Sequence, residues 1–178
     1  HTTFRVGGPA DILVQPKGTE LAAVIRLCRK YDVPYQVIGN GSNLLVGDRG
    51  IRGLVIEMLS KEDEICVEDD CITVGAGMLL SKTANRAAEH GLTGMEFAAG
   101  IPGSIGGAVV MNAGAYGGEM KDILTAVTVL DQEGNEKILS AEELELGYRT
   151  SCILKKGYIV TGAKIKLKHG EETAFRAG

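Results

Sequence analysis

Glycine is concentrated in a few short stretches of this chain rather than spread along it. The 178 residues include 25 glycines, about twice the usual share of roughly 7%. Most of them lie in residues 39–53, 75–77 and 91–118. Because glycine has no Cβ, it suits sharp turns and places where the backbone approaches a ligand closely. The clustering therefore indicates built turns or ligand contacts and argues against a flexible linker.

The remaining composition is that of a soluble globular protein, with 44% hydrophobic and 24% charged residues. A chain of this length fits one domain, or two small lobes that share a core. The net charge of −4 and the pI near 5.4 argue against a nucleic-acid partner. No apolar run approaches the ~20 residues of a membrane helix, and we see no signal peptide. We therefore expect neither nucleic acid nor membrane as a partner.

Cysteine and histidine usage gives no sign of a metal site. The four cysteines lack C-x-x-C spacing: Cys28, Cys66, Cys71 and Cys152. Their even number is compatible with disulfides, but free thiols in a reducing cytoplasm are the favoured interpretation. Because no His/Cys cluster is present, we expect no metal.

The pattern of apolar residues predicts strands interspersed with a few helices. Strands are expected at residues 10–15, 35–38, 44–46, 53–58, 65–67, 71–74, 126–130, 136–139 and 158–168. Helices are expected after Thr19 as a cap, at about 79–90, from 105 to 111, and after a capping box of Ser140 with Glu143. This order predicts an α+β fold with two lobes, at about 1–75 and 76–168, and a charged tail at 169–178.

A strand that runs into a glycine-rich turn is the first candidate binding element. Gly39 and Gly41 leave room for backbone amides to point at a diphosphate, and Ser42 and Asn43 add neutral donors. The alternative is a tight turn between two strands.

Residues 98–115 are mostly small, which suits a backbone that lies against a large flat ligand. The helix expected at 105–111 could turn its free amides toward a phosphate. The alternative is close packing of a helix on a sheet. Two glycine-rich segments about sixty positions apart favour one extended ligand that both contact.

Two common nucleotide-binding motifs are missing. No glycine stands in the G-x-x-x-x-G-K-[ST] pattern of a P-loop. Gly39-Asn40-Gly41 lacks the third glycine of the dinucleotide fingerprint, and a strand-like segment follows it instead of a helix. Residues 147–151, Gly-Tyr-Arg-Thr-Ser, are by themselves typical of a solvated turn.

Taken together, these segments resemble the UDP-N-acetylenolpyruvoylglucosamine reductase family. The resemblance runs through residues 1–11, 39–44, 94–97, 100–117 and 147–151. It implies the two-lobed FAD-binding fold of the vanillyl-alcohol-oxidase-like (PCMH-type) flavoproteins. It also implies that the following residues line FAD: Gly39, Asn40, Gly41, Ser42, Asn43, Leu44, Gly100, Ile101, Pro102, Gly103, Ser104, Gly106, Gly107, Asn112, Gly114, Ala115 and Tyr116. Since neither loop holds a His or Cys, we expect the FAD to be non-covalent.

The resemblance further implies a reaction in peptidoglycan precursor synthesis in a bacterial cytoplasm. NADPH reduces the flavin, and the flavin passes hydride to the vinyl carbon of UDP-N-acetylglucosamine enolpyruvate, which gives UDP-N-acetylmuramate. Arg149 is implied as catalytic and as a substrate contact, with Tyr148 beside it. A guanidinium stays charged and presents a fork matched to the substrate carboxylate, where negative charge develops.

Part of the family pattern is missing. The family also uses a serine proton donor and a glutamate from a C-terminal substrate domain, and no segment of this chain matches them. Because general acid catalysis typically contributes ~10²–10⁴-fold, we expect the chain alone to bind FAD but to reduce substrate poorly. The alternatives are another flavin oxidoreductase of the same fold, and a flavin-binding module without catalysis.

Overall fold

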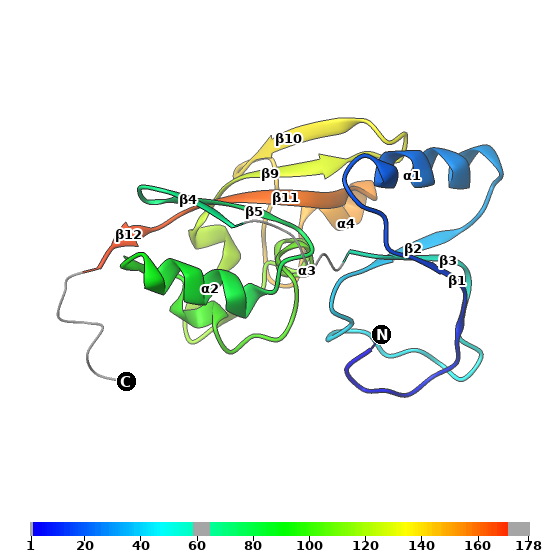
Figure 1. Cartoon of the computed structure of the whole chain (residues 1–178), viewed down its shortest axis with the longest axis horizontal. Helices are drawn as coiled ribbons and strands as arrows, with labels where there is room; N and C mark the ends of the chain where they lie inside the picture. Colours follow the sequence, from blue (N-terminus) through cyan, green and yellow to red (C-terminus); the bar gives the residue numbers. More distant parts are fainter. Residues whose placement is uncertain (1, 59–64, 171–178) are drawn as a thin grey trace.

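The computed structural model describes residues 2–58 and 65–170, which form two main sheets with helices packed against them (Figure 1). The first is a parallel sheet of three strands in the order β1-β3-β2. Its strands are β1 (Ala10–Val14), β2 (Tyr35–Ile38) and β3 (Ile51–Glu57). This sheet and helix α1 (Glu20–Lys30) make up one end of the molecule.

Helix α1 covers the first sheet with one apolar face. Leu21, Ile25 and Cys28 recur at helical spacing and are buried. They pack in one cluster with Leu54 and Ile56 of β3. The expected side-chain cap at Thr19 is wrong. Thr19 occupies the capping position, but its hydroxyl accepts no bond from the first turn, and the carboxylate of Glu20 accepts the Lys17 amide at 2.8 Å.

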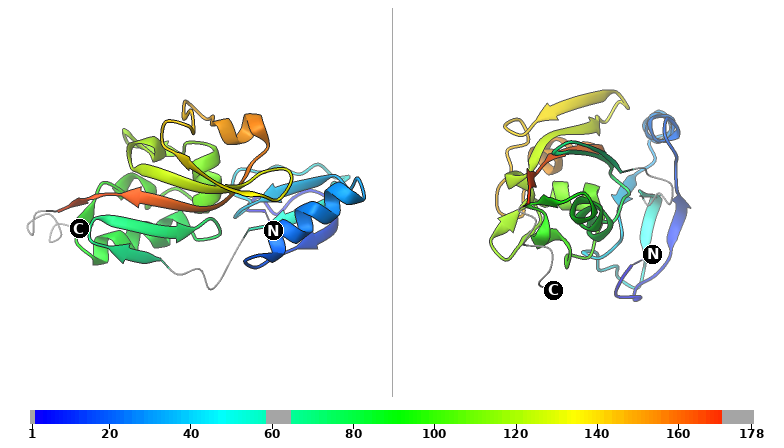
Figure 2. Two further views of the ribbon diagram at one scale, coloured as in Figure 1. Left: turned by 90° about the horizontal axis from the view of Figure 1, so that it is seen from above. Right: turned by 60° about the vertical axis from the view of Figure 1, so that its left-hand side comes forward.

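The second sheet is antiparallel, with five strands in the order β10-β9-β11-β5-β4. Its strands are β4 (Cys66–Glu68), β5 (Cys71–Gly75), β9 (Leu124–Leu130), β10 (Glu136–Ser140) and β11 (Ile159–Lys166). Helices α2 (Leu80–Glu89) and α3 (Ile105–Val110) lie on one face of it (Figures 1 and 2). The mixture of sheets and helices confirms the expected α+β class.

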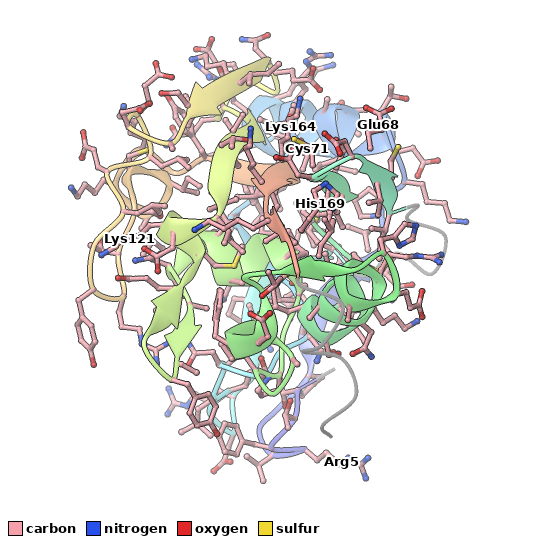
Figure 3. All side chains as sticks on the ribbon, turned by 90° about the vertical axis from the view of Figure 1, so that its left-hand side faces the viewer. Arg5, Glu68, Cys71, Lys121, Lys164 and His169 are labelled. Atoms are coloured by element: carbon pink, nitrogen blue, oxygen red, sulfur yellow. The ribbon has the colours of Figure 1, made fainter. Side chains whose placement is uncertain are left out.

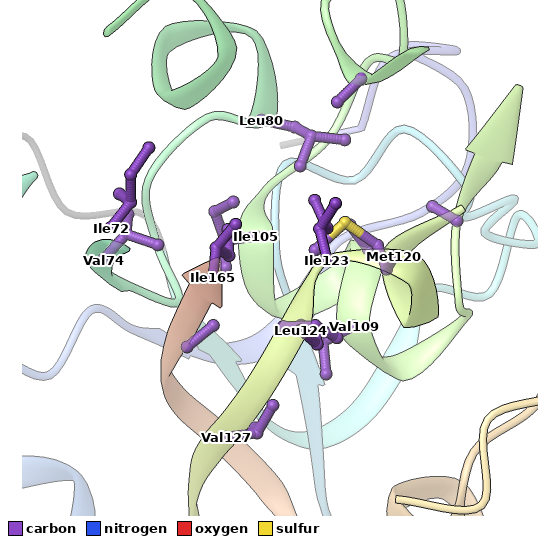
Figure 4. Close-up of a cluster of buried hydrophobic side chains, with 14 of the residues drawn as sticks. Ile72, Val74, Leu80, Ile105, Val109, Met120, Ile123, Leu124, Val127 and Ile165 are labelled. Atoms are coloured by element: carbon purple, nitrogen blue, oxygen red, sulfur yellow. The ribbon is translucent and has the colours of Figure 1, made fainter. Parts of the chain in front are cut away.

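The main core lies between this sheet and the two helices. Figure 4 shows Ile72 and Val74 of β5, Ile105 of α3 and Ile165 of β11 gathered there. Each is at most 2% exposed, and burying such a side chain contributes roughly 1.5–3 kcal/mol. This packing anchors α3 beneath the sheet and so fixes the glycine-rich segment that leads into it.

Shorter elements complete the described chain. They are β6 (Leu92–Thr93) paired with β12 (Lys168–His169), β7 (Gly114–Ala115) paired with β8 (Gly118–Glu119), the 3₁₀ turns η1 (Glu96–Ala98) and η2 (Met120–Asp122), and α4 (Cys152–Lys156).

Four local expectations differ from the structure. Residues 44–46 form no strand, and β3 begins at Ile51 instead of 53. Ser140 and Glu143 do bond as a capping box, but irregular turns follow them instead of a helix. The last long strand ends at Lys166, and Lys168 begins β12.

The two sheets divide the chain earlier than the lobe boundary expected near Gly75. The hairpin β4–β5 pairs with β11 and so belongs to the larger sheet. In addition, Leu130 and Ile159 of the larger sheet pack in the apolar cluster beneath α1. The two halves therefore share apolar contacts across their boundary.

Candidate functional site

The two glycine-rich loops lie directly against each other. The first is formed by residues 39–44, and the second begins at residue 100 and leads into α3. The hydroxyl of Ser42 donates to the carbonyl of Pro102 at 2.9 Å. A Cβ placed on Gly39 would come within 2.2 Å of the Ser104 hydroxyl oxygen, so any larger residue there would force the Ser104 side chain to move. The expectation that these distant segments fold together is confirmed.

A cavity of about 670 Å³ opens beside this contact. Its volume lies within the roughly 300–1,000 Å³ that is typical of small-molecule and cofactor sites. Its wall includes residues 39–44, which form the first loop, and residues 101–104 of the second. The start of α3 and the residues around the start of β11 also contribute. The cavity therefore draws on both halves of the chain.

Most of the residues expected to hold a cofactor line this cavity. They are Gly39, Asn40, Gly41, Ser42, Asn43, Leu44, Ile101, Pro102, Gly103, Ser104, Gly106 and Gly107, together with Arg149. Others do not belong to its wall: Gly100, Asn112, Gly114, Ala115, Tyr116 and Tyr148. The assignment of individual residues to ligand contacts stays a prediction.

The first loop offers the cavity unused backbone donors. Gly41 has a φ of +62°, a conformation that suits glycine and turns successive amides toward one side. Within the described ranges, the amides of residues 40–43 donate to no other residue. An anion in the cavity could accept bonds from these amides without any cationic side chain.

The start of α3 differs from what the sequence suggested. Its first two amides are already used, because Ile105 donates to the Met78 carbonyl at 2.8 Å and Gly106 donates to the Ala76 carbonyl at 2.9 Å. The Ser104 hydroxyl caps the Gly107 amide at 3.4 Å. The expectation that free amides of this helix face a phosphate is wrong. A Cβ on Gly106 would lie 3.0 Å from the Cβ of Ala76, so close helix–sheet packing explains this glycine.

Asn112 and the segment after it have partners within the protein. Asn112 is 4% exposed, and its side chain bonds to Glu119, Gly147 and Lys121. A Cβ on Gly114 would lie 2.6 Å from the Gly118 carbonyl oxygen across the β7–β8 pair. Both aromatic residues expected at the site are almost fully exposed: Tyr116 at 98% and Tyr148 at 92%.

Arg149 lies in a tight turn at the cavity wall. Gly147 and Thr150 form an isolated antiparallel bridge, with N···O distances of 3.1 and 3.3 Å, and Arg149 has a φ of +53° between them. A residue other than glycine in this conformation costs of order 1–3 kcal/mol and is often found at functional sites. No ion pair or hydrogen bond engages its guanidinium within the described part of the chain. Its charge is therefore available to a ligand.

Sequence reasoning missed one wall of the cavity. Ile153 and Leu154 of α4 and residues 157–160 also line it. The sequence predicts a strand at residues 158–168, makes no prediction for Ile153 and Leu154, and gives no sign of a ligand in either segment. Met58 and Ala76 also line the cavity, at the ends of two strands. Pairing of β11 with β5 and β9 fixes the position of Ile159 and Val160, and a pairing between distant strands cannot be predicted from local sequence.

The described residues show no metal-binding cluster. Among them, no group of three or more His, Cys, Asp or Glu side chains could hold a metal ion, and the four cysteines are free. Figure 3 shows His169 beside the β4–β5 hairpin, where it contacts Asp69 at 2.9 Å, well away from Lys121. No helix in the described ranges is long and apolar enough to cross a membrane.

Comparison with known proteins gives a family match and close relatives. Residues 10–140 match the model of the family described as "FAD binding domain". The chain is 52% identical over 177 residues to a UDP-N-acetylenolpyruvoylglucosamine reductase of Clostridium perfringens, covering 99% of this chain and 58% of that protein. It is 56% identical over 172 residues to the enzyme of that name from Clostridium tetani, covering 96% and 56%. The chain thus spans a little under three fifths of these relatives.

Solved structures give the same assignment of fold. The UDP-N-acetylenolpyruvylglucosamine reductase of Thermus caldophilus superposes with a TM-score of 0.79 at 42% identity, covering 98% of this chain and 61% of that one. Glucooligosaccharide oxidase of Acremonium strictum superposes with a TM-score of 0.66 at 21% identity, covering 92% and 36%. At that identity the likeness concerns the fold alone.

Proposed function

The chain belongs to the family of FAD-binding domains, and from this we propose that it binds FAD non-covalently in the cavity between its two glycine loops. We further propose that it is the cofactor-binding part of an enzyme that uses NADPH to reduce UDP-N-acetylglucosamine enolpyruvate to UDP-N-acetylmuramate. The relatives at 52% and 56% identity are named for that reductase. The observation that carries the proposal is the Ser42–Pro102 contact, which joins both loops at one cavity.

The residues at the cavity suit a long, partly anionic cofactor. The unused amides of residues 40–43 can bind a diphosphate, which an uncharged loop holds through backbone dipoles. The apolar side chains of Ile153 and Leu154, which also line the cavity, suit a flat ring system. No Cys or His lines the cavity among the described residues, which supports non-covalent binding.

Arg149 has the chemistry that the proposed reaction needs. Bound flavin supplies a hydride, and the substrate carboxylate gains negative charge as the hydride arrives. The guanidinium of Arg149, at the cavity wall and without a protein partner in the described ranges, can bind that carboxylate with two parallel bonds. A charge already in place lowers the barrier, because little reorganisation is needed as the reaction proceeds. Tyr148, next to it in the turn and 92% exposed, is proposed as a second substrate contact.

The proposal assigns only part of the activity to this chain. Because the relatives are longer, we propose that a C-terminal part of the same protein supplies the remaining substrate contacts and the proton donor. The chain alone should then bind FAD and reduce the enolpyruvyl substrate poorly. We place the whole reaction in the cytoplasm, in peptidoglycan precursor synthesis, and the free cysteines are compatible with a reducing compartment.

A spectroscopic experiment tests the proposal. The purified protein should be yellow and should release FAD, not FMN, on denaturation. In the whole protein, NADPH should bleach the flavin without oxygen, and the enolpyruvyl sugar should restore the colour. Restoration by air but not by the sugar would favour an oxidase of the same fold. A yellow protein that NADPH does not bleach would favour a binding module without catalysis.

A further inference from the structure

Asn112 connects three segments that meet beside the cavity. Its Nδ2 group donates to the Glu119 carboxylate at 2.5 Å and to the Gly147 carbonyl at 3.1 Å. Its Oδ1 atom accepts from the Lys121 amide at 2.9 Å. Both amide protons and one oxygen lone pair are thus used within the protein, and the residue is 4% exposed. Its side chain has little capacity left for a ligand.

The bond to Gly147 reaches the turn that carries Arg149. Gly147 and Thr150 close that turn by bonding to each other, and Arg149 stands between them with a φ of +53°. A second bond ties the other end of the turn to α3, because the buried Ser151 hydroxyl donates to the Val110 carbonyl at 2.8 Å. The turn is therefore attached on both sides to α3 and the residues that follow it.

We infer that Asn112 is a positioning residue for Arg149 and makes no direct contact with the cofactor. The bond to Gly147 holds the strained turn in the orientation that places Arg149 at the cavity wall. The role of Asn112 in positioning the turn rests on these contacts alone, whereas its consequence for catalysis rests on the proposed function. A carboxamide is required because the position must donate twice, to a carboxylate and to a carbonyl. Asparagine also tolerates the φ of +42° found here.

The test compares the same chemical change at two asparagines. Asn112→Asp replaces the donating group with an oxygen that faces Glu119 and Gly147. Asn135→Asp is the matched control, because Asn135 also donates to carboxylates, those of Asp131 and Glu133, but lies outside the cavity wall. Both variants are made in the whole protein. The measurements are amide hydrogen exchange at Thr150, FAD affinity, and the rates of flavin reduction by NADPH and reoxidation by the enolpyruvyl sugar.

Asn112→Asp should speed exchange at Thr150 and slow reoxidation by about tenfold or more, the size expected when a buried bond is lost. FAD affinity and reduction by NADPH should change far less, and the control should leave all four unchanged. Unaltered exchange with weakened FAD binding would overturn the inference and make Asn112 a cofactor contact. Equal slowing of both half-reactions would also overturn it and reduce Asn112 to a role in stability. If wild-type flavin is not reoxidised by the sugar, the proposed function fails, while the exchange result still decides the role of Asn112.

Discussion

The hydroxyl of Ser42 donates a 2.9 Å hydrogen bond to the carbonyl of Pro102, sixty residues further along the chain. This bond joins the loop with unused amides to the loop that leads into α3, and both line the cavity. The relative position of the two loops therefore depends in part on one side chain.

We predict that Ser42→Ala weakens FAD binding while the fold persists. A single hydrogen bond contributes about 0.5–1.5 kcal/mol net, so the Kd for FAD should rise roughly two- to tenfold. Titration followed by flavin fluorescence measures this. Thr125→Val is the control, because it removes a similar bond to the Lys164 carbonyl, 3.1 Å long and away from the cavity. An equal loss of affinity in both variants would mean that Ser42 acts only through overall stability.

We also predict a strong coupling between Gly39 and Ser104. Gly39→Ala would bring a methyl group within 2.2 Å of the Ser104 hydroxyl oxygen, which is buried and caps α3. The variant should lose about 1–2 kcal/mol in the free energy of unfolding, the usual cost of a lost helix cap. Adding Ser104→Gly removes the obstructing atoms, and glycine at a cap costs only a few tenths of a kcal/mol relative to serine.

Urea unfolding of the two single variants and the double variant tests this coupling. The double variant should be more stable than Gly39→Ala alone. Gly47→Ala is the control, since a Cβ there meets nothing within 4 Å. If the losses in the free energy of unfolding of the two single variants simply add in the double variant, Gly39 and Ser104 are not in the close contact seen in the structure.

The sequence was sufficient for elements whose signal is local. The β4–β5 hairpin around Asp69, the α2 helix and its terminal Gly91, and the β9–β10 hairpin all follow from apolar periodicity and turn residues. The contact between the two glycine loops was also predictable. Both segments are rich in residues with small or no side chains, which suggests that they contact one shared ligand.

Other features depend on contacts between distant segments. Whether the first amides of α3 are free depends on Met78 and Ala76, which arrive from the end of β5 and take both bonds. Ile159 and Val160 in the cavity wall belong to β11, whose place depends on its pairing with β5 and β9. Likewise, the sequence shows Asn112 only as a polar residue in a glycine-rich segment. Its bond to the Gly147 carbonyl depends on the fold and could not be predicted.

The turn between β9 and β10 predicts a pH effect on stability. The pKa of Asp131 is lowered to about 2, chiefly because the backbone amide of Asn135 donates to its carboxylate. The Lys137 ammonium and the backbone amide of Glu133 also lower this pKa, whereas burial acts in the opposite direction. Because the pKa in the folded state is below the ordinary value of 3.8, ionised Asp131 stabilises the fold above about pH 4. That contribution is lost as the pH falls toward 2.

Asp131→Asn tests this directly through urea unfolding between pH 7 and pH 3. The wild type should be more stable than the variant by a constant margin down to about pH 4, and the margin should shrink below it. Asp48→Asn, which removes an exposed carboxylate, controls for the change in net charge. The same pH profile for both variants would rule out the specific role of Asp131.

Substitutions at Arg149 separate its charge from its shape. In the whole protein, Arg149→Ala should slow flavin reoxidation by the enolpyruvyl sugar by roughly 10²–10³-fold, as when one preorganised donor is lost from a transition state. Arg149→Lys should fall between that variant and the wild type, because it keeps the charge but loses the two-pronged fork. Reduction of the flavin by NADPH should change little in both, since the developing carboxylate charge belongs only to the second half-reaction. Stopped-flow absorbance resolves the two rates, and FAD content shows whether the fold survives. Equal slowing of both half-reactions would instead mean that Arg149 positions the flavin or the turn, and the carboxylate would then need another partner.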